Sequence, residues 1–529
     1  MYQEYPFPSR RTCVYGNAIC ASSSPWASQA GLEILQKGGN AIDAAIAMAS
    51  TLTVTEPTCN GLGSDMFALI WKDEKLYGYN GSGKSPKALD PDILRNMGLR
   101  ELPLDGVIPI TVPGAVKGWY DIWEKFGKLS FEECFEPAIH YGKEGFIVTP
   151  QLAILWEDSY RRFGDKKESI YQPWKETFAP KGRAPREGER FVNKDIAKTL
   201  EIISKTKTKD FYHGKLADKI VDTITKAGGY LRKEDLENHK GLWVQPLKTT
   251  YRGVDIWELP PNGHGITVLM TLQLLEELPL ETMSEELSRH YTIEALKLAY
   301  TDVREYVADP DHMICTPEQL LHLEYSNSRR KLLEEQAQEA KIGTPPGEST
   351  VYFAVADEEG TMVSWIQSNY EGFGSGVVIP GTSIACNDRG ANFNLRKGHA
   401  NEAGGGKRSY HTIIPGFMTK DGKAFGAFGV MGGFMQPQGQ VQVIRRLLDD
   451  GYNPQAALDA PRWQWLGGLS LEVEEDMNPN GIKDLKTRGH DIQMVKDSRS
   501  MGRGQIILKT KEGYVAGTEK RTDGSIYAR

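Results

Sequence analysis

Apolar and polar residues follow two different spacings along the chain, and the change from one to the other falls near residue 350. Between about residues 115 and 340, apolar residues recur at helical spacing in segments such as SRHYTIEALKLAYTDVREYV (288–307). This spacing predicts helices. Beyond residue 350 the pattern alternates instead, in TVYFAVAD (350–357) and TMVSWIQSN (361–369). Strict alternation across a short polar link that ends in glycine predicts a β-hairpin.

The same two patterns continue through the rest of the chain. Helices are predicted at 27–36, 41–52 and about 437–450, and strands at 65–72, 75–80, 411–419 and 423–430. Gly38-Gly39 closes the first helix, and Asn40 is suited to cap the second, which is apolar nearly all round. Helices around consecutive hairpins predict a layered α+β fold, without internal repeats.

Size and composition are those of a soluble globular protein. The chain has 529 residues, of which 40% are apolar and 25% charged. A net charge of -7 argues against nucleic acid or an anionic membrane as a partner. No signal-type apolar segment and no long apolar run are present, so we expect a cytoplasmic protein that does not enter the membrane.

The distribution of cysteine and histidine argues against a metal enzyme. The six cysteines have no metal-type spacing, and the ten histidines form no HExxH or comparable pair. We expect reduced, mostly buried thiols. Neither a metal ion nor an organic cofactor is implied.

A glycine-rich segment, Gly78 to Ser85 (GYNGSGKS), matches the GxxxxGK[ST] phosphate-binding loop. Such a loop works when its Lys-Ser pair opens a helix whose first N–H groups point at the phosphate. Here Pro86 follows at once and Pro91 soon after, which leaves that helix poorly supported. A glycine-rich turn after a strand is the better interpretation.

A second candidate is the stretch GESTVYFAVAD (347–357), in which a threonine opens a strand directly behind a loop rich in proline and glycine. The hydroxyl of Thr350 can attack the carbonyl of Ser349, and hydrolysis of the ester then frees a new N-terminus. Its α-amine, with a pKa near 8, can serve as general base for the same hydroxyl. The plain alternative is a threonine at a strand edge. A serine elbow at Gly381–Ala385 is a weaker rival, because its pattern is imperfect.

Several long blocks resemble the γ-glutamyltransferase family, including its cephalosporin-acylase-like members. They include GGNAIDAAIAMASTLTVTEPTCNGLGSDMFALIW (38–71), ITVPGAVKGWYDIWEKFG (110–127) and TVYFAVADEEGTMVSWIQSNYEGFGSG (350–376), in the family's order. The resemblance implies a four-layer αββα sandwich of the N-terminal-nucleophile hydrolases. It also implies a proenzyme that cleaves itself into residues 1–349 and 350–529, which stay together as a heterodimer.

The resemblance also assigns catalytic roles. Thr350 matches the nucleophile, Ser368 the hydroxyl that supports it, and Gly432-Gly433 the glycine pair whose N–H groups form the oxyanion hole. Backbone N–H groups beside a helix N-terminus are suited to that task. The alternatives are a half-exposed strand serine and a plain strand-to-helix turn.

The positions that hold the substrate depart from the family. Ser82 stands at the usual arginine for the α-carboxylate, with Lys84 nearby, and Asn392 stands at the usual acid for the α-amine. The remaining departures are Tyr370 for asparagine, Arg389 for glutamine, and His411-Thr412 for a Ser-Ser pair. The resemblance therefore implies an intact catalytic centre with altered amino-acid recognition.

The implied activity is that of an amidohydrolase or acyltransferase that works through a threonyl acyl-enzyme. The default donor is a small γ-glutamyl amide such as glutathione, and the alternative within the enzyme class is a glutaryl or cephalosporin side-chain acylase. A different class remains open, in which an unprocessed, inactive relative serves as a binding protein.

Overall fold

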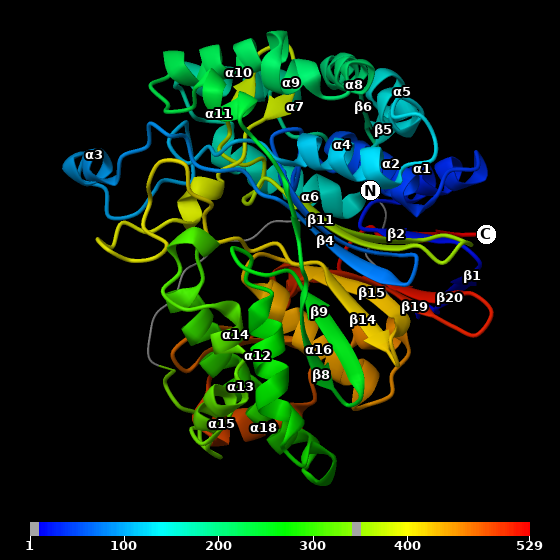
Figure 1. Ribbon diagram of the computed structural model, residues 1–529, viewed down its shortest axis with the longest axis vertical. Helices are drawn as coiled ribbons and strands as arrows, with labels where there is room; N and C mark the ends of the chain where they lie inside the picture. The colour runs from blue at the N-terminus through cyan, green and yellow to red at the C-terminus, as the bar shows by residue number, and fades with distance from the viewer. Residues whose placement is uncertain (1–9, 341–350) are drawn as a thin grey trace.

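Two antiparallel sheets lie face to face between two layers of helices in the computed structural model, which describes residues 10–340 and 351–529 (Figure 1). Thr350 and Ser349 therefore lie outside the described residues. Each sheet has seven strands, and each takes strands from both sides of residue 350. The αββα sandwich predicted for this chain is confirmed.

The first sheet contains the strand that the sequence singles out, β10, in its interior. In spatial order its strands are β21 (Ser525–Ala528), β2 (Ile19–Ser22), β10 (Val351–Ala356), β11 (Met362–Ser368), β3 (Asp65–Lys72), β4 (Lys75–Gly81) and β7 (Leu242–Val244). β10 pairs antiparallel with β2 on one side and with β11 on the other. The predicted hairpin at 350–369 and the strand pair at 65–80 are confirmed within the described residues.

The second sheet packs against the first. Its strands, in spatial order, are β1 (Val14–Gly16), β20 (Tyr514–Thr518), β19 (Arg503–Lys509), β15 (Lys423–Met431), β14 (Gly416–Lys420), β9 (Val254–Glu258) and β8 (Leu247–Tyr251). β10 touches both β15 and β19 across the interface between the sheets. A side chain at Gly429 would collide with the ring of Tyr352, so the glycine allows this aromatic ring to pack closely against the second sheet.

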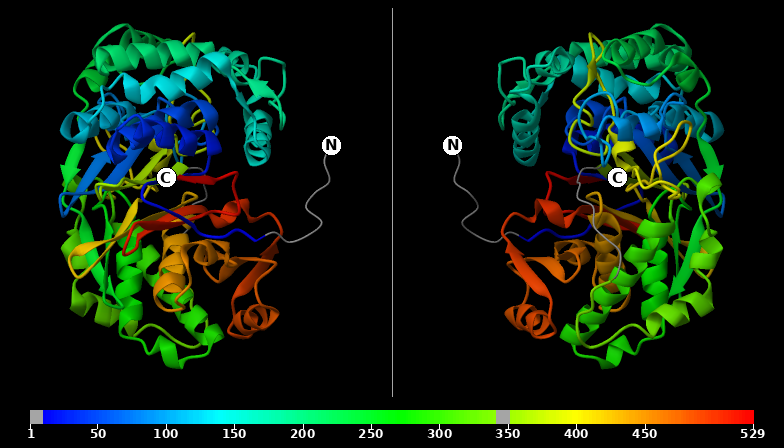
Figure 2. Two further views of the ribbon diagram at one scale, coloured as in Figure 1. Left: turned by 90° about the vertical axis from the view of Figure 1, so that its right-hand side faces the viewer. Right: turned by 90° about the vertical axis from the view of Figure 1, so that its left-hand side faces the viewer.

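Helices cover the outer face of each sheet (Figures 1 and 2). Those on the side of the first sheet are α1 (Pro25–Gln36), α2 (Ala41–Thr55), α4 (Ala115–Phe126), α5 (Glu136–Glu144), α6 (Pro150–Phe163), α7 (Gln172–Phe178), α8 (Lys194–Thr206), α9 (Lys209–His213), α10 (Lys215–Lys226) and α11 (Lys233–Glu237), with α3 (Pro91–Asn96) in a peripheral loop. Those on the side of the second sheet are α12 (Ile266–Glu276), α13 (Glu285–Tyr306), α14 (Pro317–Leu320), α15 (Leu323–Arg330), α16 (Met435–Leu448), α17 (Pro454–Asp459) and α18 (Pro479–Thr487).

Short strands complete the fold at its edges. They are β5 (Phe146–Ile147) with β6 (Arg190–Phe191), β12 (Val378–Ile379) with β13 (Ile384–Ala385), and the three-stranded β16 (Trp463–Gly467), β17 (Ser470–Glu474) and β18 (Asp491–Val495). Among the described helices, none combines the length and apolar character that crossing a membrane requires. All six cysteines are unpaired, and four of them are buried.

The predicted cap of α2 is confirmed, and it is tied to β10. The side chain of Asn40 accepts from the N–H groups of Ile42 and Asp43, and the Asp43 carboxylate accepts from the N–H of Asn40. Asp357, at the end of β10, accepts from the N–H of Ala41 at 2.8 Å. A buried helix start and the end of the central strand therefore hold each other in place.

Several boundaries differ from the sequence expectation by up to five residues, and two of these differences lie next to predicted site residues. The strand predicted at 411–419 begins only at Gly416, because residues 411–415 leave the sheet and make a single bridge from His411 to Gly263. The helix predicted from 437 begins at Met435. The first difference matters for function, because it frees His411 and Thr412 to turn toward other polar side chains.

The two competing motifs have plain structural explanations. Residues 82–90 do not form a helix after the glycine-rich segment, and a side chain at Gly83 would collide with the carbonyl of Val112. The segment is therefore a close-packed turn after β4 rather than a phosphate loop. Ser383 lies between β12 and β13, with no helix following it, and donates a hydrogen bond to Asn193 at 2.8 Å.

Candidate active site

The start of β10 is the place where the predicted catalytic residues should meet. β10 is described from Val351, which pairs with Gln367 of β11. Ser368 is the next residue and ends β11; it is fully buried, and its hydroxyl accepts from the N–H of Tyr370 at 2.8 Å. Ser368 therefore lies beside the point where the strand of the predicted nucleophile begins.

The glycine pair lies between β15 and α16 in a conformation that favours glycine. Gly432 has φ 137° and Gly433 has φ 53°. Their carbonyls accept from Met435 and Gln436 at 2.9 and 3.2 Å, which starts the helix. Neither N–H of the pair is hydrogen-bonded within the described part of the chain. Two backbone donors next to a helix N-terminus are what an oxyanion hole requires.

Residues 411–415, which leave the predicted strand, connect the two parts of the site. The N–H of Ile414 donates to the side chain of Gln436 at 3.0 Å, next to the glycine pair. Thr412 accepts from the Arg389 guanidinium at 3.0 Å, and that guanidinium lies 5.0 Å from the centre of the Tyr370 ring. The structure thus brings together Tyr370, Arg389 and Thr412, three of the departures from the family pattern.

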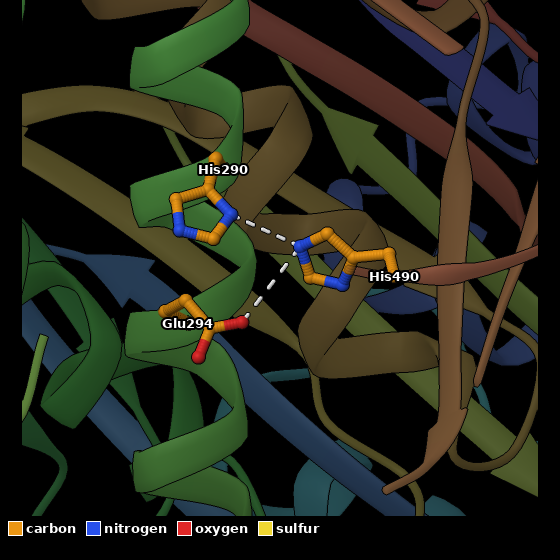
Figure 3. A group of neighbouring side chains, drawn as sticks. All are labelled: His290, Glu294 and His490. Carbon is orange, nitrogen blue, oxygen red and sulfur yellow. Dashed lines mark hydrogen bonds and ion pairs between the residues drawn. The ribbon is translucent and has the colours of Figure 1, made fainter. Parts of the chain in front are cut away.

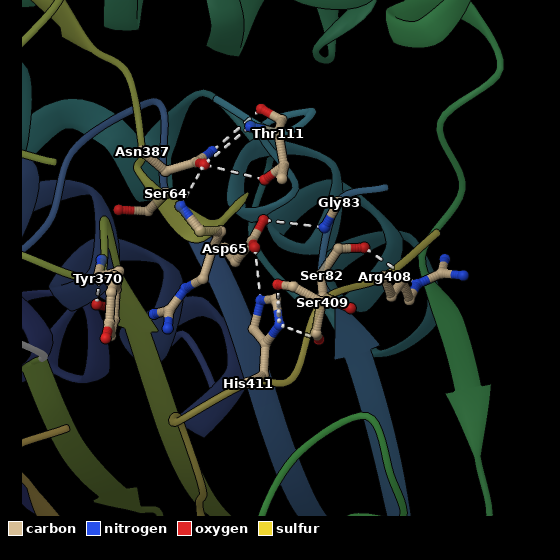
Figure 4. Close-up of polar contacts among 12 residues, drawn as sticks. Ser64, Asp65, Ser82, Gly83, Thr111, Tyr370, Asn387, Arg408, Ser409 and His411 are labelled. Carbon is tan, nitrogen blue, oxygen red and sulfur yellow. Dashed lines mark hydrogen bonds and ion pairs between the residues drawn. The ribbon is translucent and has the colours of Figure 1, made fainter. Parts of the chain in front are cut away.

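A buried acid and imidazole form the centre of a polar network (Figure 4). Asp65 Oδ2 lies 2.7 Å from His411 Nε2, and Asp65 Oδ1 accepts from the N–H of Gly83 at 3.0 Å. Burial lowers the pKa of His411 despite the carboxylate beside it. Nε2 faces the carboxylate and donates to it, and Nδ1 lies 3.1 Å from Asn262 Nδ2 and 3.0 Å from the carbonyl oxygen of Ser409.

The network continues from Asn262 to the position of the family's arginine. Asn262 Oδ1 accepts from Asn80 Nδ2 at 2.9 Å, and Asn80 Oδ1 accepts from both the N–H and the hydroxyl of Ser82, at 3.0 and 2.6 Å. All of these side chains are buried. The Ser82 hydroxyl proton and both ring nitrogens of His411 are therefore used inside the protein, away from any substrate.

Asn392 and Lys84, the two remaining residues predicted to bind substrate, have polar groups that are not used in this network. Asn392 ends the short helix Arg389–Asn392, and its Nδ2 is buried without a hydrogen-bond partner among the described residues. Lys84 is half-buried; its carbonyl accepts from Val112, and its ammonium forms no ion pair within the described ranges. Both residues offer donors rather than an acid.

Sequence reasoning missed the residues that hold this site together, namely Asp65, Asn80, Asn262 and Asp388. Asp65 opens a strand of otherwise apolar character, DMFALIW, and a charged residue there is a usable signal. Asn80 ends the following strand. Asn262 and Asp388 lie in loops whose sequence, PPNGHG and NDRG, indicates only turns.

A second cluster, away from these residues, contains His290, Glu294 and His490 (Figure 3). Its ligand-type atoms lie within 4.8 Å of one another, with His290 Nδ1 and His490 Nε2 at 3.0 Å. His290 Nε2 donates to the carbonyl of Glu334 at 2.9 Å. His290 Nδ1 therefore has a lone pair, and it accepts the proton of His490 Nε2.

The charges around this cluster oppose a metal cation. Lys297 binds the Glu294 carboxylate at 2.7 Å and neutralises it. Burial, with Lys297, His290 and Arg488, lowers the pKa of His490 to about 3. A divalent ion would be placed beside the cations Lys297 and Arg488, and the cluster's acid, Glu294, is already neutralised. The cluster is better explained as a hydrogen-bonded connection between α13 and the segment before β18.

The two stacked antiparallel sheets between helical layers are those of an N-terminal-nucleophile hydrolase. The family model described as Gamma-glutamyltranspeptidase matches residues 27–529. The chain belongs to the γ-glutamyltranspeptidase family.

Individual relatives agree with this assignment. The crystal structure of cephalosporin acylase from Bacillus halodurans is similar with a TM-score of 0.97 and 50% identity, covering 100% of this chain and 99% of that one. The Glutathione hydrolase-like YwrD proenzyme of Bacillus subtilis (strain 168) is 36% identical over 511 residues, 94% of this chain and 96% of the relative. The Acylase ACY 1 proenzyme of Pseudomonas sp. (strain SE83) is 31% identical over 524 residues, 96% and 92%.

Asp388 gives the site a pH dependence that stability measurements can detect. It is fully buried; its Oδ1 accepts from the N–H of Glu371, and its Oδ2 lies 3.7 Å from Arg162. Burial raises its pKa to about 7, although Arg162 favours the charged form. Between pH 4 and 7 the folded state therefore keeps a proton that the unfolded state has lost, and stability falls as pH rises.

Asp388→Asn should remove this penalty. The free energy of unfolding of the variant, relative to wild type, should increase from pH 4 to 7 and then level off, with a slope of at most about 1.4 kcal/mol per pH unit. Urea unfolding at a series of pH values measures this difference. Parallel curves for the two proteins would show that Asp388 is ionised in the folded state throughout.

Proposed function

We propose that the protein is a self-processing amidohydrolase that cleaves amides of short acids with a second, free carboxylate, γ-glutamyl and glutaryl amides among them. Two observations carry the proposal: the buried Ser368 lies beside the start of β10, and the N–H groups of Gly432 and Gly433, at the end of a strand that packs against β10, are unbonded in the described part of the chain. The family membership and the names of the relatives, a glutathione hydrolase-like proenzyme and two acylases, support it.

Processing supplies the catalytic base. The hydroxyl of Thr350 attacks the carbonyl of Ser349, the peptide becomes an ester, and water hydrolyses the ester. The products are a carboxylate on Ser349 and a free α-amine on Thr350. This amine has a pKa near 8 and can take the proton of its own hydroxyl, which a peptide nitrogen cannot do.

Turnover then follows acyl-transfer chemistry. The Thr350 oxygen attacks the donor amide, and the N–H groups of Gly432 and Gly433 stabilise the negative oxygen that develops. The amine of Thr350 returns the proton to the leaving amine, and Ser368 orients the nucleophile by hydrogen bonding. Water, or a second amine, resolves the acyl-enzyme in the same way.

The donor preference depends on the polar groups that the hydrogen-bonded network around Asp65 and His411 does not use. A γ-glutamyl group carries an α-amine, which in the family meets an acid, whereas Asn392 offers a buried N–H donor here. Ser82 and His411 are bonded to each other through Asn80 and Asn262. Recognition of the α-amine is therefore weak, and donors without it should be accepted.

The first prediction concerns processing. Active material should consist of residues 1–349 and 350–529, with the new N-terminus TVYFAVAD, as determined by intact mass and N-terminal sequencing. Thr350→Ala should stay uncut and inactive, and Thr350→Ser should process slowly, because serine keeps the hydroxyl. A fully active single chain would refute the mechanism. An uncut chain without activity would favour the binding-protein alternative.

The second prediction concerns the oxyanion hole. Gly433→Ala should lower kcat by at least about tenfold, since loss of one such donor lowers it by about 10²- to 10³-fold. Alanine is a sharper test than valine, because a β-branched residue at φ 53° adds strain of its own.

Gly468→Ala is the matched control for this substitution. Gly468 also has φ 53°, lies in the turn between β16 and β17, and has open space where its side chain would be. The control carries the same backbone penalty and should leave kcat unchanged. Equal kcat in both variants would place the oxyanion hole elsewhere.

The third prediction concerns the α-amine. The kcat/KM values of wild type for glutaryl and γ-glutamyl p-nitroanilide should agree within about tenfold, equivalent to ~1.4 kcal/mol. Asn392→Asp should shift the ratio toward the γ-glutamyl donor, because it restores an acid for the amine. Asn392→Ala controls for loss of the side chain. A thousandfold rejection of glutaryl amides by wild type, or an unmoved ratio in Asn392→Asp, would contradict this assignment.

A further inference from the structure

Arg389 is a fully buried cation whose hydrogen bonds are incomplete. Its Nη1 donates to Thr412 Oγ1 at 3.0 Å, whereas Nε and Nη2 have no hydrogen-bond partner among the described residues. Burial lowers the pKa of its guanidinium, which reflects the cost of keeping a charge away from water. A buried arginine in this condition calls for an explanation.

Two other buried arginines of the chain, Arg462 and Arg521, are paired with acids. Arg462 binds Glu519 at 2.8 Å, and Arg521 binds both Glu519 and Glu474, at 2.6 and 2.5 Å. All of these side chains are buried. The buried Arg408 donates instead to the carbonyls of Ser82 and Lys240. Arg389 has neither kind of partner on its Nε and Nη2 among the described residues.

Asp65 and Asp388 are the two acids that act most strongly on the Arg389 charge, and both are bound by other groups. Asp65 is bound by His411 and by the N–H of Gly83. Asp388 is bound by the N–H of Glu371 and lies 3.7 Å from Arg162. Within the described ranges, no carboxylate lies within the 4.0 Å ion-pair distance of Arg389. The missing partner is therefore absent from the described protein.

The two unbonded nitrogens define the shape of that partner. Nε and Nη2 lie on the same edge of the planar guanidinium, so their N–H bonds are nearly parallel and match the two oxygens of a carboxylate. Thr412 holds the opposite corner, and the Tyr370 ring lies 5.0 Å from the guanidinium carbon. These contacts fix the plane of the group and leave one edge for a bidentate anion.

We propose that the Nε–Nη2 edge of Arg389 binds the free carboxylate of the acyl donor, so that the substrates are monoamides of short dicarboxylic acids. This inference rests on the proposed function and identifies the residue that selects its donor. Ser82, at the position where the family has its arginine, is bonded to Asn80 and does not compete for the carboxylate. The α-carboxylate of a γ-glutamyl group and the terminal carboxylate of a glutaryl group occupy the same place in the acyl chain, so Arg389 would bind both.

The kinetic test compares donors with and without the carboxylate, using the processed enzyme. Wild type should hydrolyse glutaryl p-nitroanilide about 100-fold more efficiently than butyryl p-nitroanilide, since a charge-assisted pair in a buried site is worth about two powers of ten. Arg389→Gln should remove this preference by lowering kcat/KM for the glutaryl donor alone. Arg389→Lys should keep part of it, because lysine retains the charge without the two-pronged geometry.

A binding test needs no turnover. Calorimetry should show that glutarate binds wild type more tightly than butyrate, and that Arg389→Gln abolishes the difference. Arg396→Gln is the matched control, because Arg396 is an exposed arginine seven residues further on, paired with Glu305 at 3.1 Å. This control should retain both the glutarate affinity and the donor preference.

The outcomes separate the two proposals. Equal binding of glutarate and butyrate by wild type overturns the inference without recourse to any variant. An equal loss of activity toward both donors in Arg389→Gln overturns it too, because a purely structural role predicts that pattern. If the enzyme cleaves neither anilide but binds glutarate through Arg389, the inference stands and the proposed function fails. If it cleaves γ-glutamyl amides with no dependence on Arg389, the proposed function stands and the inference about Arg389 fails.

Discussion

The pairing of β10 on both of its edges is the constraint on which the rest of the structure depends. β2 and β11 flank this strand in register, and β15 and β19 cover one of its faces. Because an interior strand cannot shift without breaking two ladders, the position where β10 begins is fixed relative to Ser368. A site that needs a chain end at one defined point is built on a strand of this kind.

The polar side of the site depends on a chain of fully satisfied hydrogen bonds. Asp65, His411, Asn262, Asn80 and Ser82 are all buried, and each uses its groups on the next. Such a network is rigid, because breaking any member leaves a buried polar group without a partner. Ser82 and His411 stand at positions where the resemblance implies substrate contacts, and both are used inside the network, which supports a proposal that places donor recognition on other residues.

The contrast between this network and Arg389 separates structure from function. Where the fold buries charge for its own stability, it supplies a partner, as between Arg521 and Glu474. Where two donors of a buried guanidinium are left over, the pattern indicates a group that arrives with the substrate. The His290–His490 pair is assigned to structure on other grounds: its rings bond to each other and to the carbonyl of Glu334, and Lys297 neutralises the acid beside them.

The sequence by itself determined the elements whose signals are local. The apolar face and cap of α2, the β3–β4 pair and the β10–β11 hairpin follow from spacing and from a few capping or turn residues, since neighbours in sequence form them. The family's motifs supplied the candidate catalytic residues. Tertiary structure alone decided that residues 411–415 leave the sheet, that Asp65 meets His411 from 346 positions away, and that Arg389 lacks an acid. Contacts of this kind depend on which loops the packed sheets bring together, and no local pattern of residues encodes that.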